Sequence, residues 1–252
     1  NIKAVLSLID PELSLLAKHK QEFLQIGTTP IVSDYDVVEL CFDKYKMFQF
    51  LVQNELPTVQ SYINKEEFYR DVKADKINYP VFVKPVKGSA SININKVHSK
   101  DEIELLFSRY DNLMIQEYMD GTEYGVDAYI DMISEEPVAI FIKEKLKMRA
   151  GETDKSVSVK NEQLLKLIKK FVKVAGFKGI VDIDVFKVNG EFYLSEVNPR
   201  FGGGYPHAYE NDVNIPKMII NNVNGTVNAD LIDLYEEGNY MMKFNEIKLI
   251  EK

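Results

Sequence analysis

Two short apolar runs near the start of the chain are separated by a helical pattern. Residues 4–9 have the length of a strand, and residues 30–32 form a second apolar run. Asp10, Pro11 and Glu12 have the composition of a helix start, with proline in the first turn. A strand, a helix and a strand in this order predict one parallel β-α-β unit. Such a unit must pack on the rest of the chain or belong to a larger domain.

The next region alternates between apolar strands and amphipathic helices. Apolar residues at helical spacing predict a single helix over residues 36–53, which contains Lys44. A lysine at this place is also compatible with simple exposure on a helix surface. Residues 58–118 then predict a compact α+β unit. Its strands are expected at 58–62, 80–85, 92–97 and 113–118, and its helices at 65–75 and after the capping residue Ser99.

Residues 119–252 predict a larger α+β unit. Residues 123–133 and 137–145 are expected to form an antiparallel pair, and the polar stretch 148–158 a mobile loop. The amphipathic pattern over 161–175 predicts a helix that Gly176 ends. The remaining expected elements are two strands on either side of Asn189-Gly190, a glycine-rich turn at 202–204, a helix at about 214–222 and a strand near 247–250.

Composition narrows the class of protein. The chain has 252 residues, 45% of them hydrophobic and 28% charged, with a net charge of −8. An acidic protein is a poor partner for nucleic acid or an anionic membrane, so we expect it to bind neither. The sequence shows no run of membrane-spanning length. Cys41 is the single cysteine, which excludes an intrachain disulfide and fits a cytoplasmic protein.

Acidic residues gather on the two strands around Asn189-Gly190. A two-residue turn would place Asp184 and Glu196 on opposite faces of the hairpin. A three-residue turn at 188–190 would pair residue 182 with 196 and 184 with 194, which puts both carboxylates and Asn198 on one face. A metal site therefore predicts the three-residue turn, although Asn-Gly favours the tight one. Such oxygen ligands suit Mg²⁺ or Mn²⁺ bound to nucleotide phosphates, whereas the alternative is a solvated hairpin face.

A second candidate site follows the apolar strand that ends at Lys84. The loop behind it consists of small residues, whose backbone amides can approach phosphate oxygens while the lysine neutralises their charge. A plain turn between two strands is the alternative. Walker A and GxGxxG patterns are absent. The small residues of this loop are Gly88, Ser89, Ala90 and Ser91.

Three further groups could contact ligands. The strand that ends at residues 116–119 could pair its backbone with a base, and Glu123 could accept hydrogen bonds from ribose hydroxyls. Asp10 and Glu12 could recognise an amine. A basic cluster could bind a substrate carboxylate or a γ-phosphate, or could be a solvated charge run; it consists of Lys145, Lys147 and Arg149.

Together these residues resemble the ATP-grasp superfamily, in its carbamoyl-phosphate synthase large-subunit-like and biotin carboxylase-like branch. The resemblance is carried by the order of Lys44, Lys84 with its loop, residues 116–119, Glu123 and the Asp184…Glu196-Val-Asn198-Pro-Arg200 set. It implies an α+β fold with two subdomains that grip a nucleotide, preceded by a partial Rossmann-like α/β unit. The implied boundaries are 1–35, 36–118 for the small subdomain with its linker helix, and 119–252 for the large one.

The resemblance also implies a role for each matching residue. ATP phosphates would contact Lys44 and Lys84 under the loop of residues 88–91. The base would be held by Gln116, Glu117, Tyr118 and Met119, and the ribose by Glu123. The metal ligands would be Asp184, Glu196 and Asn198, with Arg200 on the transferred phosphoryl group; the implied catalytic residues are Arg200, Lys84 and Asn198. Asp182 stands where ligases of the D-alanine type often carry arginine, which sets the chain apart from that branch.

The implied activity is that of a Mg²⁺- or Mn²⁺-dependent ligase. It would activate a small carboxylate as an acyl phosphate with ATP and join it to an amine. The resemblance leaves open a homo-oligomer. Two other functions stay open: an ATP-binding module without turnover, and a phosphotransferase of the kinase type on the same fold.

Overall fold

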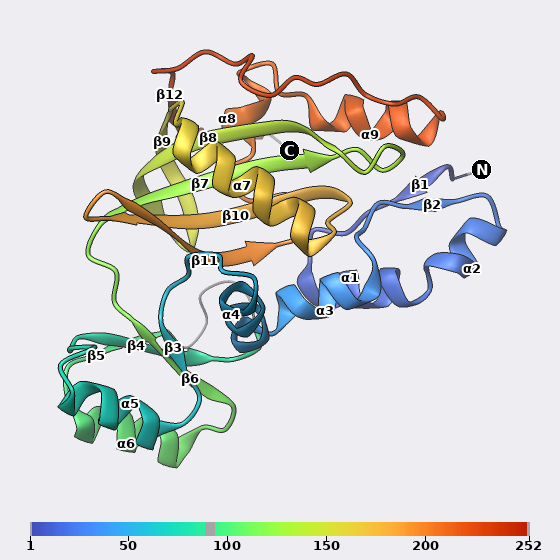
Figure 1. The fold of residues 1–252 in the computed structure, drawn as a ribbon. Coiled ribbons are helices and arrows are strands. Elements are labelled where there is room, and N and C mark those ends of the chain that lie inside the picture. Colours follow the sequence, from blue (N-terminus) through green and yellow to red (C-terminus); the bar gives the residue numbers. More distant parts are fainter. Residues whose placement is uncertain (1, 89–93, 251–252) are drawn as a thin grey trace.

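The computed structural model describes residues 2–88 and 94–250 and arranges them around three β-sheets (Figure 1). Its helices and its mainly antiparallel strands confirm the predicted α+β class. The first sheet pairs two strands in parallel, which confirms the predicted β-α-β unit. This unit consists of β1 (Ala4–Val5), α1 (Asp10–Lys18), α2 (Lys20–Gln25) and β2 (Thr29–Pro30).

A break divides the helix that the sequence predicts over residues 36–53. The structure has α3 (Tyr35–Phe42) and α4 (Lys44–Gln53), separated by Asp43. Asp43 leaves the helical conformation, and its carboxylate accepts a hydrogen bond from the Lys46 N–H at 3.0 Å. Aspartate is favoured at a helix N-cap because it satisfies a free amide of the first turn. The prediction of one continuous helix is therefore wrong, and the break puts Lys44 at the start of α4.

The second sheet, in the order β3-β6-β4-β5, forms the small α+β unit. Val81 and Val83 join the core beneath two helices, while Phe82 and Lys84 point to the opposite face, because successive strand residues alternate. That opposite face looks toward the large sheet (Figure 1). The elements are β3 (Ser61–Tyr62), α5 (Lys65–Lys73), β4 (Val81–Pro85), β5 (Asn95–Val97), α6 (Lys100–Arg109) and β6 (Leu113–Glu117).

The third sheet, in the order β11-β10-β7-β8-β9-β12, is antiparallel throughout. It confirms the pair expected at 123–133 and 137–145. The strands are β7 (Thr122–Ile130), β8 (Pro137–Arg149), β9 (Glu152–Ser158), β10 (Gly179–Val188), β11 (Glu191–Asn198) and β12 (Tyr240–Met242).

The two faces of the large sheet differ. One face is packed against α7 (Glu162–Ala175), the predicted amphipathic helix, which ends at Gly176 with a positive φ of 71°. The other face is covered only in part, by α8 (Pro206–Tyr209) and α9 (Ile215–Val223). The remainder of that second face carries polar side chains and looks toward the small sheet.

Two expected elements near the large sheet are different in the structure. Residues 148–158, predicted as a mobile loop, form a hairpin in which β8 extends to Arg149 and β9 starts at Glu152. The inward-facing residues of β9 are hydroxyl-bearing, such as the buried Ser156 and Ser158, so the strand lacks an apolar alternation. The prediction of a strand near residues 247–250 is also wrong. That segment is irregular, with Ile247 and Leu249 about nine-tenths exposed, and the last strand is β12.

The sheets are compatible with the expected division of the chain. No strand is shared between the small and the large sheet in the part of the chain that is described. The boundaries at 35 and 118 stay a proposal. Among residues 2–88 and 94–250, the helices are too short or too polar to cross a bilayer.

Candidate functional site

The turn between β10 and β11 contains two residues. Val188 pairs with Glu191, which leaves Asn189 and Gly190 at the tip with φ values of 52° and 90°. Both central residues of such a tight turn need positive φ, and Asn-Gly supplies it at low cost. The predicted three-residue turn at 188–190 is therefore wrong.

A β-bulge nevertheless puts the acidic residues on one face. Val185 pairs with Leu194, but Asp184 pairs with Glu196, so Ser195 is an additional residue in β11. The additional residue shifts the alternation of one strand against the other. As a result Asp184 lies opposite Glu196, and Asp182 lies opposite Asn198. The shared face that the metal hypothesis requires is present, by a different route from the expected one.

This face forms the floor of a cleft of about 860 Å³ between the small and the large sheet. Ligand sites of proteins typically have volumes of about 300–1,000 Å³. Its apolar lining includes Phe82, Ile94, Met119 and Phe186. Its polar and charged lining includes Lys84, Gln116, Glu117, Glu123, Lys145, Asp184, Glu196, Asn198 and Arg200.

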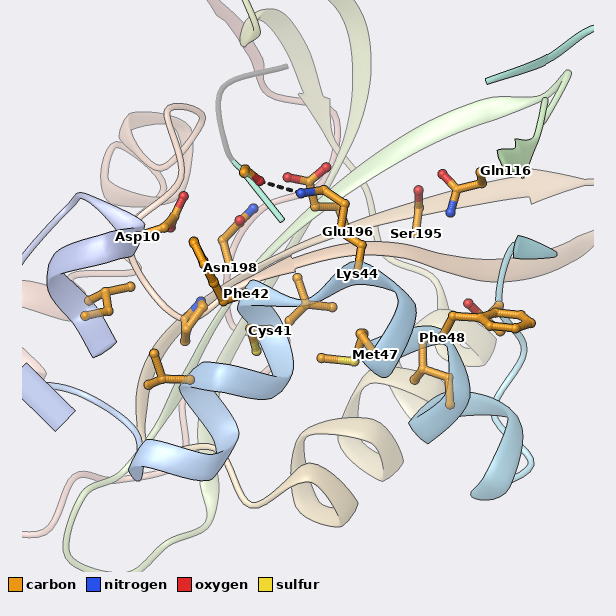
Figure 2. Close-up of a pocket in the computed structure, with 17 residues that line it drawn as sticks. Asp10, Cys41, Phe42, Lys44, Met47, Phe48, Gln116, Ser195, Glu196 and Asn198 are labelled. Carbon is orange, nitrogen blue, oxygen red and sulfur yellow. Dashed lines mark hydrogen bonds between the residues drawn. The ribbon is translucent and has the colours of Figure 1, made fainter. Parts of the chain in front are cut away.

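Lys44 lies at a smaller cavity beside this cleft, of about 20 Å³ (Figure 2). Glu196 and Asn198 line both cavities. Figure 2 shows Lys44 on the same side as Glu196, above the apolar side chains of α3 and α4. The ammonium group of Lys44 donates a hydrogen bond to the carbonyl oxygen of Gly88. The helix break at Asp43 thus gives Lys44 a place next to the hairpin, which a lysine inside a straight helix would not have.

Lys84 is buried in the wall formed by the small sheet, with 6% of its surface exposed. Burial lowers its pKa to about 8, because the charged form loses hydration. Glu196 and Asp184 act in the opposite direction and favour the charged form, while Lys44 disfavours it. Lys84 is therefore an ammonium group with little solvent and, among the described residues, no ion-pair partner in contact; such an environment would attract an anion.

Lys145 lies in the opposite wall, on β8. Its Nζ atom is 2.5 Å from Asp184 Oδ1 and 2.8 Å from Glu123 Oε1. Burial lowers the pKa of Lys145, but attraction by the two carboxylates outweighs this effect and raises the pKa above its ordinary value. Lys145 therefore links the two positions that the sequence predicts for metal and ribose binding.

The structure does not bring the rest of the predicted basic cluster to the cleft. Lys147 is exposed on β8. Arg149 is 55% exposed; it donates a hydrogen bond to Asn245 Oδ1 at 3.2 Å and lies 3.9 Å from Asp154. Of the three predicted cations the cleft lining contains Lys145, because register shifts on either side of Lys147 interrupt the alternation of β8.

A buried ion pair beneath the floor was not predicted. Lys143 and Asp127 contact each other with 1% and 0% of their side chains exposed, and Asp127 Oδ1 has no hydrogen-bond partner among the described residues. Asp182 lies beside this pair, opposite Asp127 in the sheet. Burial, Asp184 and Asp127 raise the pKa of Asp182 to about 7, against the opposing charges of Lys143 and Lys145. One pattern in the sequence could have indicated this ion pair: lysines stand at alternate positions along β8, and alternate residues of a strand share one face.

The glycine-rich turn covers this end of the cleft. A Cβ atom on Gly202 would clash with the Asp182 carboxylate, and one on Gly204 would lie 2.8 Å from Lys143 Cε. A side chain at either position would have to displace Asp182 or Lys143, because the backbone lies directly on these polar side chains of the floor.

Arg200 follows β11 and points to the N-terminal unit. Its Nε atom donates to Asp10 Oδ1 at 2.8 Å, and its Nη1 atom donates to the Phe201 carbonyl oxygen at 3.1 Å. Asp10 lines the cleft, in agreement with its candidate place at a substrate. Glu12 does not line it; its carboxylate is exposed and accepts a hydrogen bond from Ser7 Oγ at 2.5 Å. Of these two candidates Asp10 lies at the cleft and Glu12 does not, since side chains two residues apart on α1 point to different sides of the helix.

The segment predicted to hold a base contributes three of its four side chains to the cleft. Gln116, Glu117 and Met119 line it, and Gln116 Nε2 donates to Ser61 Oγ at 3.1 Å. Tyr118 does not line it; its ring packs beside Phe82 and lies 3.6 Å below the ammonium group of Lys96. The expected phosphate-loop residues Ser89, Ala90 and Ser91 lie outside the described residues.

The oxygen atoms on the floor are chemically suited to a divalent cation. Asp184, Glu196 and Asn198 supply hard oxygen ligands from paired strands, as Mg²⁺ prefers. The described residues contain no group of three acidic, histidine or cysteine side chains able to hold a metal by itself. This fits a cation whose remaining ligands are phosphate oxygens and water, which is the usual arrangement for Mg²⁺ at nucleotides.

The chain belongs to the ATP-grasp domain family, whose pattern matches residues 41–204. Residues 1–31 match a second family, the PylC-like N-terminal domain. These matches confirm the resemblance to the ATP-grasp superfamily.

Curated relatives have two kinds of activity. The chain is 27% identical over 176 residues to the arginine-specific carbamoyl phosphate synthase large chain of Geobacillus stearothermophilus, which covers 66% of this chain and 17% of that protein. It is 27% identical over 194 residues to a D-alanine–D-alanine ligase of Acetivibrio thermocellus, which covers 63% of this chain and 50% of that protein. The chain thus spans half or less of the length of these relatives. D-alanine ligases are similar to it despite Asp182 at the position discussed above.

The fold is also that of solved biotin carboxylases. The biotin carboxylase domain of 2-oxoglutarate carboxylase from Hydrogenobacter thermophilus, solved with MgADP and bicarbonate, superposes with a TM-score of 0.77 at 18% identity. The match covers 94% of this chain and 57% of that one. The expected carbamoyl-phosphate synthase-like and biotin carboxylase-like branch is therefore confirmed at the level of sequence and fold.

Proposed function

We propose that this chain is an ATP-dependent, Mg²⁺- or Mn²⁺-requiring ligase that joins a carboxylate to an amine and forms ADP. One observation carries the proposal. Two carboxylates and a carboxamide, on Asp184, Glu196 and Asn198, share one face of a bulged hairpin; buried Lys84 faces them from the small sheet, and Lys145 lies beside them on the large sheet. Fixed cations opposite oxygen ligands would neutralise a polyphosphate, which few other ligands need.

The proposal gives a nucleotide one direction in this cleft. The adenine would lie near Phe82 and Phe186, with Gln116, Glu117 and Met119 beside its edge. Glu123 would accept hydrogen bonds from the ribose. The phosphates would then extend over Lys84 and Lys44 toward Arg200, with Mg²⁺ between them and the hairpin carboxylates.

The residues around the cleft would then stabilise the negative charge of the phosphates and keep water away from the acyl phosphate. When bound, Mg²⁺ would neutralise phosphate charge. Lys84 and Arg200 would donate hydrogen bonds to the oxygens of the phosphoryl group while this group moves from ATP to the substrate carboxylate and leaves ADP. The glycine-rich turn at 202–204 and the adjacent hairpin would limit the access of water, which otherwise hydrolyses an acyl phosphate. The amine would attack the carbonyl carbon and release phosphate.

The partners and the place of action belong to the same proposal. The substrates would be a small carboxylate and a small amine. A cytoplasmic enzyme is supported by the proposed use of ATP and by the single, half-buried cysteine. A homo-oligomer is supported by the similar biotin carboxylase domain, which was solved as a dimer.

The experiment is to measure ADP release from Mg-ATP with pooled carboxylates and pooled amines, together and separately. A ligase gives ADP that depends on both pools, with phosphate and a condensed product that mass spectrometry detects. ADP release with the carboxylate pool alone, and a stable phosphorylated product, would instead favour the phosphotransferase. Nucleotide binding without ADP release under any condition would contradict both catalytic functions and favour the ATP-binding module.

A further inference from the structure

We infer that Asp10 is a positioning residue for Arg200, and that it couples the N-terminal β-α-β unit to the phosphate end of the cleft. The inference rests on the proposed function, which puts Arg200 beside the transferred phosphoryl group. Asp10 and Arg200 are 13% and 16% exposed, so water screens their ion pair only in part.

The hydrogen bonds of Arg200 fix its guanidinium plane. Nε donates to Asp10, Nη1 donates to the Phe201 carbonyl oxygen, and Asp182 Oδ2 lies 3.8 Å from Nη1. None of the described residues accepts a hydrogen bond from Nη2. A guanidinium group is planar and rigid, so hydrogen bonds from two of its nitrogens fix the direction of the third. The Asp10 bond therefore directs the remaining donors of Arg200 into the cleft.

Helix α1 holds the Asp10 carboxylate in place. Asp10 is its first residue, where the helix dipole favours a negative charge. Leu13, one turn later, is 1% exposed in the core that α1 forms with α3. Ser14 Oγ donates to Glu39 Oε1 of α3 at 2.6 Å. The carboxylate is thus supported by packing that is independent of Arg200.

A direct role of Asp10 in binding the amine is the competing explanation. Its Oδ1 atom already accepts from Arg200, and its charge is balanced by the guanidinium group. The two explanations differ in one measurable respect. A positioning role acts only through Arg200, whereas a direct role would be independent of it.

The experiment compares Asp10→Asn, Asp10→Glu, Arg200→Lys and the double variant Asp10→Asn/Arg200→Lys with the unchanged protein. Ser14→Ala is the matched control, because it weakens the docking of α1 without removing the ion pair. Nuclear magnetic resonance of the arginine Nε–H groups detects the hydrogen bond from Arg200 Nε to Asp10, here called the tether, without any nucleotide. Calorimetry measures the affinities for the Mg²⁺ complexes of AMP-PNP, a non-hydrolysable ATP analogue, and of ADP. The difference between these affinities reports how the tether affects binding of the γ-phosphate.

We expect Asp10→Asn to remove the protected Arg200 Nε–H signal and to weaken AMP-PNP binding about tenfold, with ADP binding changed less than about twofold. Asp10→Glu should restore most of the affinity. The double variant should bind AMP-PNP no more weakly than Arg200→Lys alone, since interacting residues are not additive. Ser14→Ala should lower the unfolding temperature and leave the discrimination between the two nucleotides unchanged.

Two results would overturn the inference by itself: an Arg200 Nε–H signal that Asp10→Asn leaves intact, or losses of affinity that add in the double variant. A protein that shows the tether signal and binds neither nucleotide would overturn the proposed function, and with it this role of Asp10. The resonance measurement therefore separates the two failures.

Discussion

Lys84 and Lys145 lie in opposite walls of one cleft, and their surroundings act on their charge in opposite directions. Lys84, from the small sheet, has no carboxylate in contact, and burial lowers its pKa to about 8. Lys145, from the large sheet, is equally buried, but Asp184 and Glu123 raise its pKa. Burial alone therefore does not decide the charge of a lysine; the distance to a counter-charge does. We infer that Lys84 is available to a phosphate, whereas Lys145 is part of the floor.

The largest effect on activity is expected from a substitution of Glu196. Of the two carboxylates that favour the charged form of Lys84, Glu196 has the stronger influence. Glu196→Gln should lower turnover of Mg-ATP at least about 100-fold, because it removes a proposed metal ligand and the counter-charge of Lys84 together. Steady-state ADP release measures this. Glu191→Gln, on the exposed end of the same strand, is the control and should keep full activity. Unchanged turnover in Glu196→Gln would remove the metal role from the hairpin.

The next largest effect concerns the pH dependence of stability. The pKa of Lys84 is lower in the folded than in the unfolded protein, where it is about 10.4. Between these values the unfolded state binds more protons, so folding becomes more favourable as pH rises from about 8 to about 10.4. Over this range the unfolding free energy of the protein should increase by about 3 kcal/mol relative to Lys84→Met.

Urea unfolding at several pH values measures this difference. The Lys145→Met comparison is the control, because a raised pKa keeps Lys145 charged in both states up to about pH 10. Its stability difference from the unchanged protein should be constant over most of the same range. A constant difference for Lys84→Met as well would contradict the contrast between the two lysines.

A smaller effect is expected from the removal of Lys145 at neutral pH. Lys145→Met leaves Asp184 and Glu123 without their shared cation, at 24% and 27% exposure. Loss of one partner from a fully buried pair costs about 3–5 kcal/mol, and partial hydration of these carboxylates reduces this to about 2 kcal/mol. The midpoint of urea unfolding measures the loss. Lys147→Met, two residues along the same strand and exposed, should change stability by less than about 0.5 kcal/mol.

The site was predictable where local pattern and family resemblance agreed. Lys84, Gln116, Glu123, Asp184 and Glu196 were named from the sequence, and the cleft contains all of them. Lys147, Arg149 and Glu12 were named from their neighbours in the sequence and lie elsewhere. Proximity along the chain was a poor guide there: the register of β8 shifts between Lys145 and Lys147 and again between Lys147 and Met148, which interrupts the alternation of its faces, and a helix rotates each residue by about 100°.

Local chemistry in the amino-acid sequence determined helix α7 and the tight turn. Helix α7 follows from its apolar spacing and Gly176, and Asn189-Gly190 supplies the positive φ that a two-residue turn needs. The tertiary structure decided the bulge at Ser195 and the ion pair of Asp10 with Arg200. The bulge depends on which face of β11 must pack against other elements, and the ion pair joins residues that only the packing of α1 brings together. Neither is a property of neighbouring residues, which is why only the folded chain contains them.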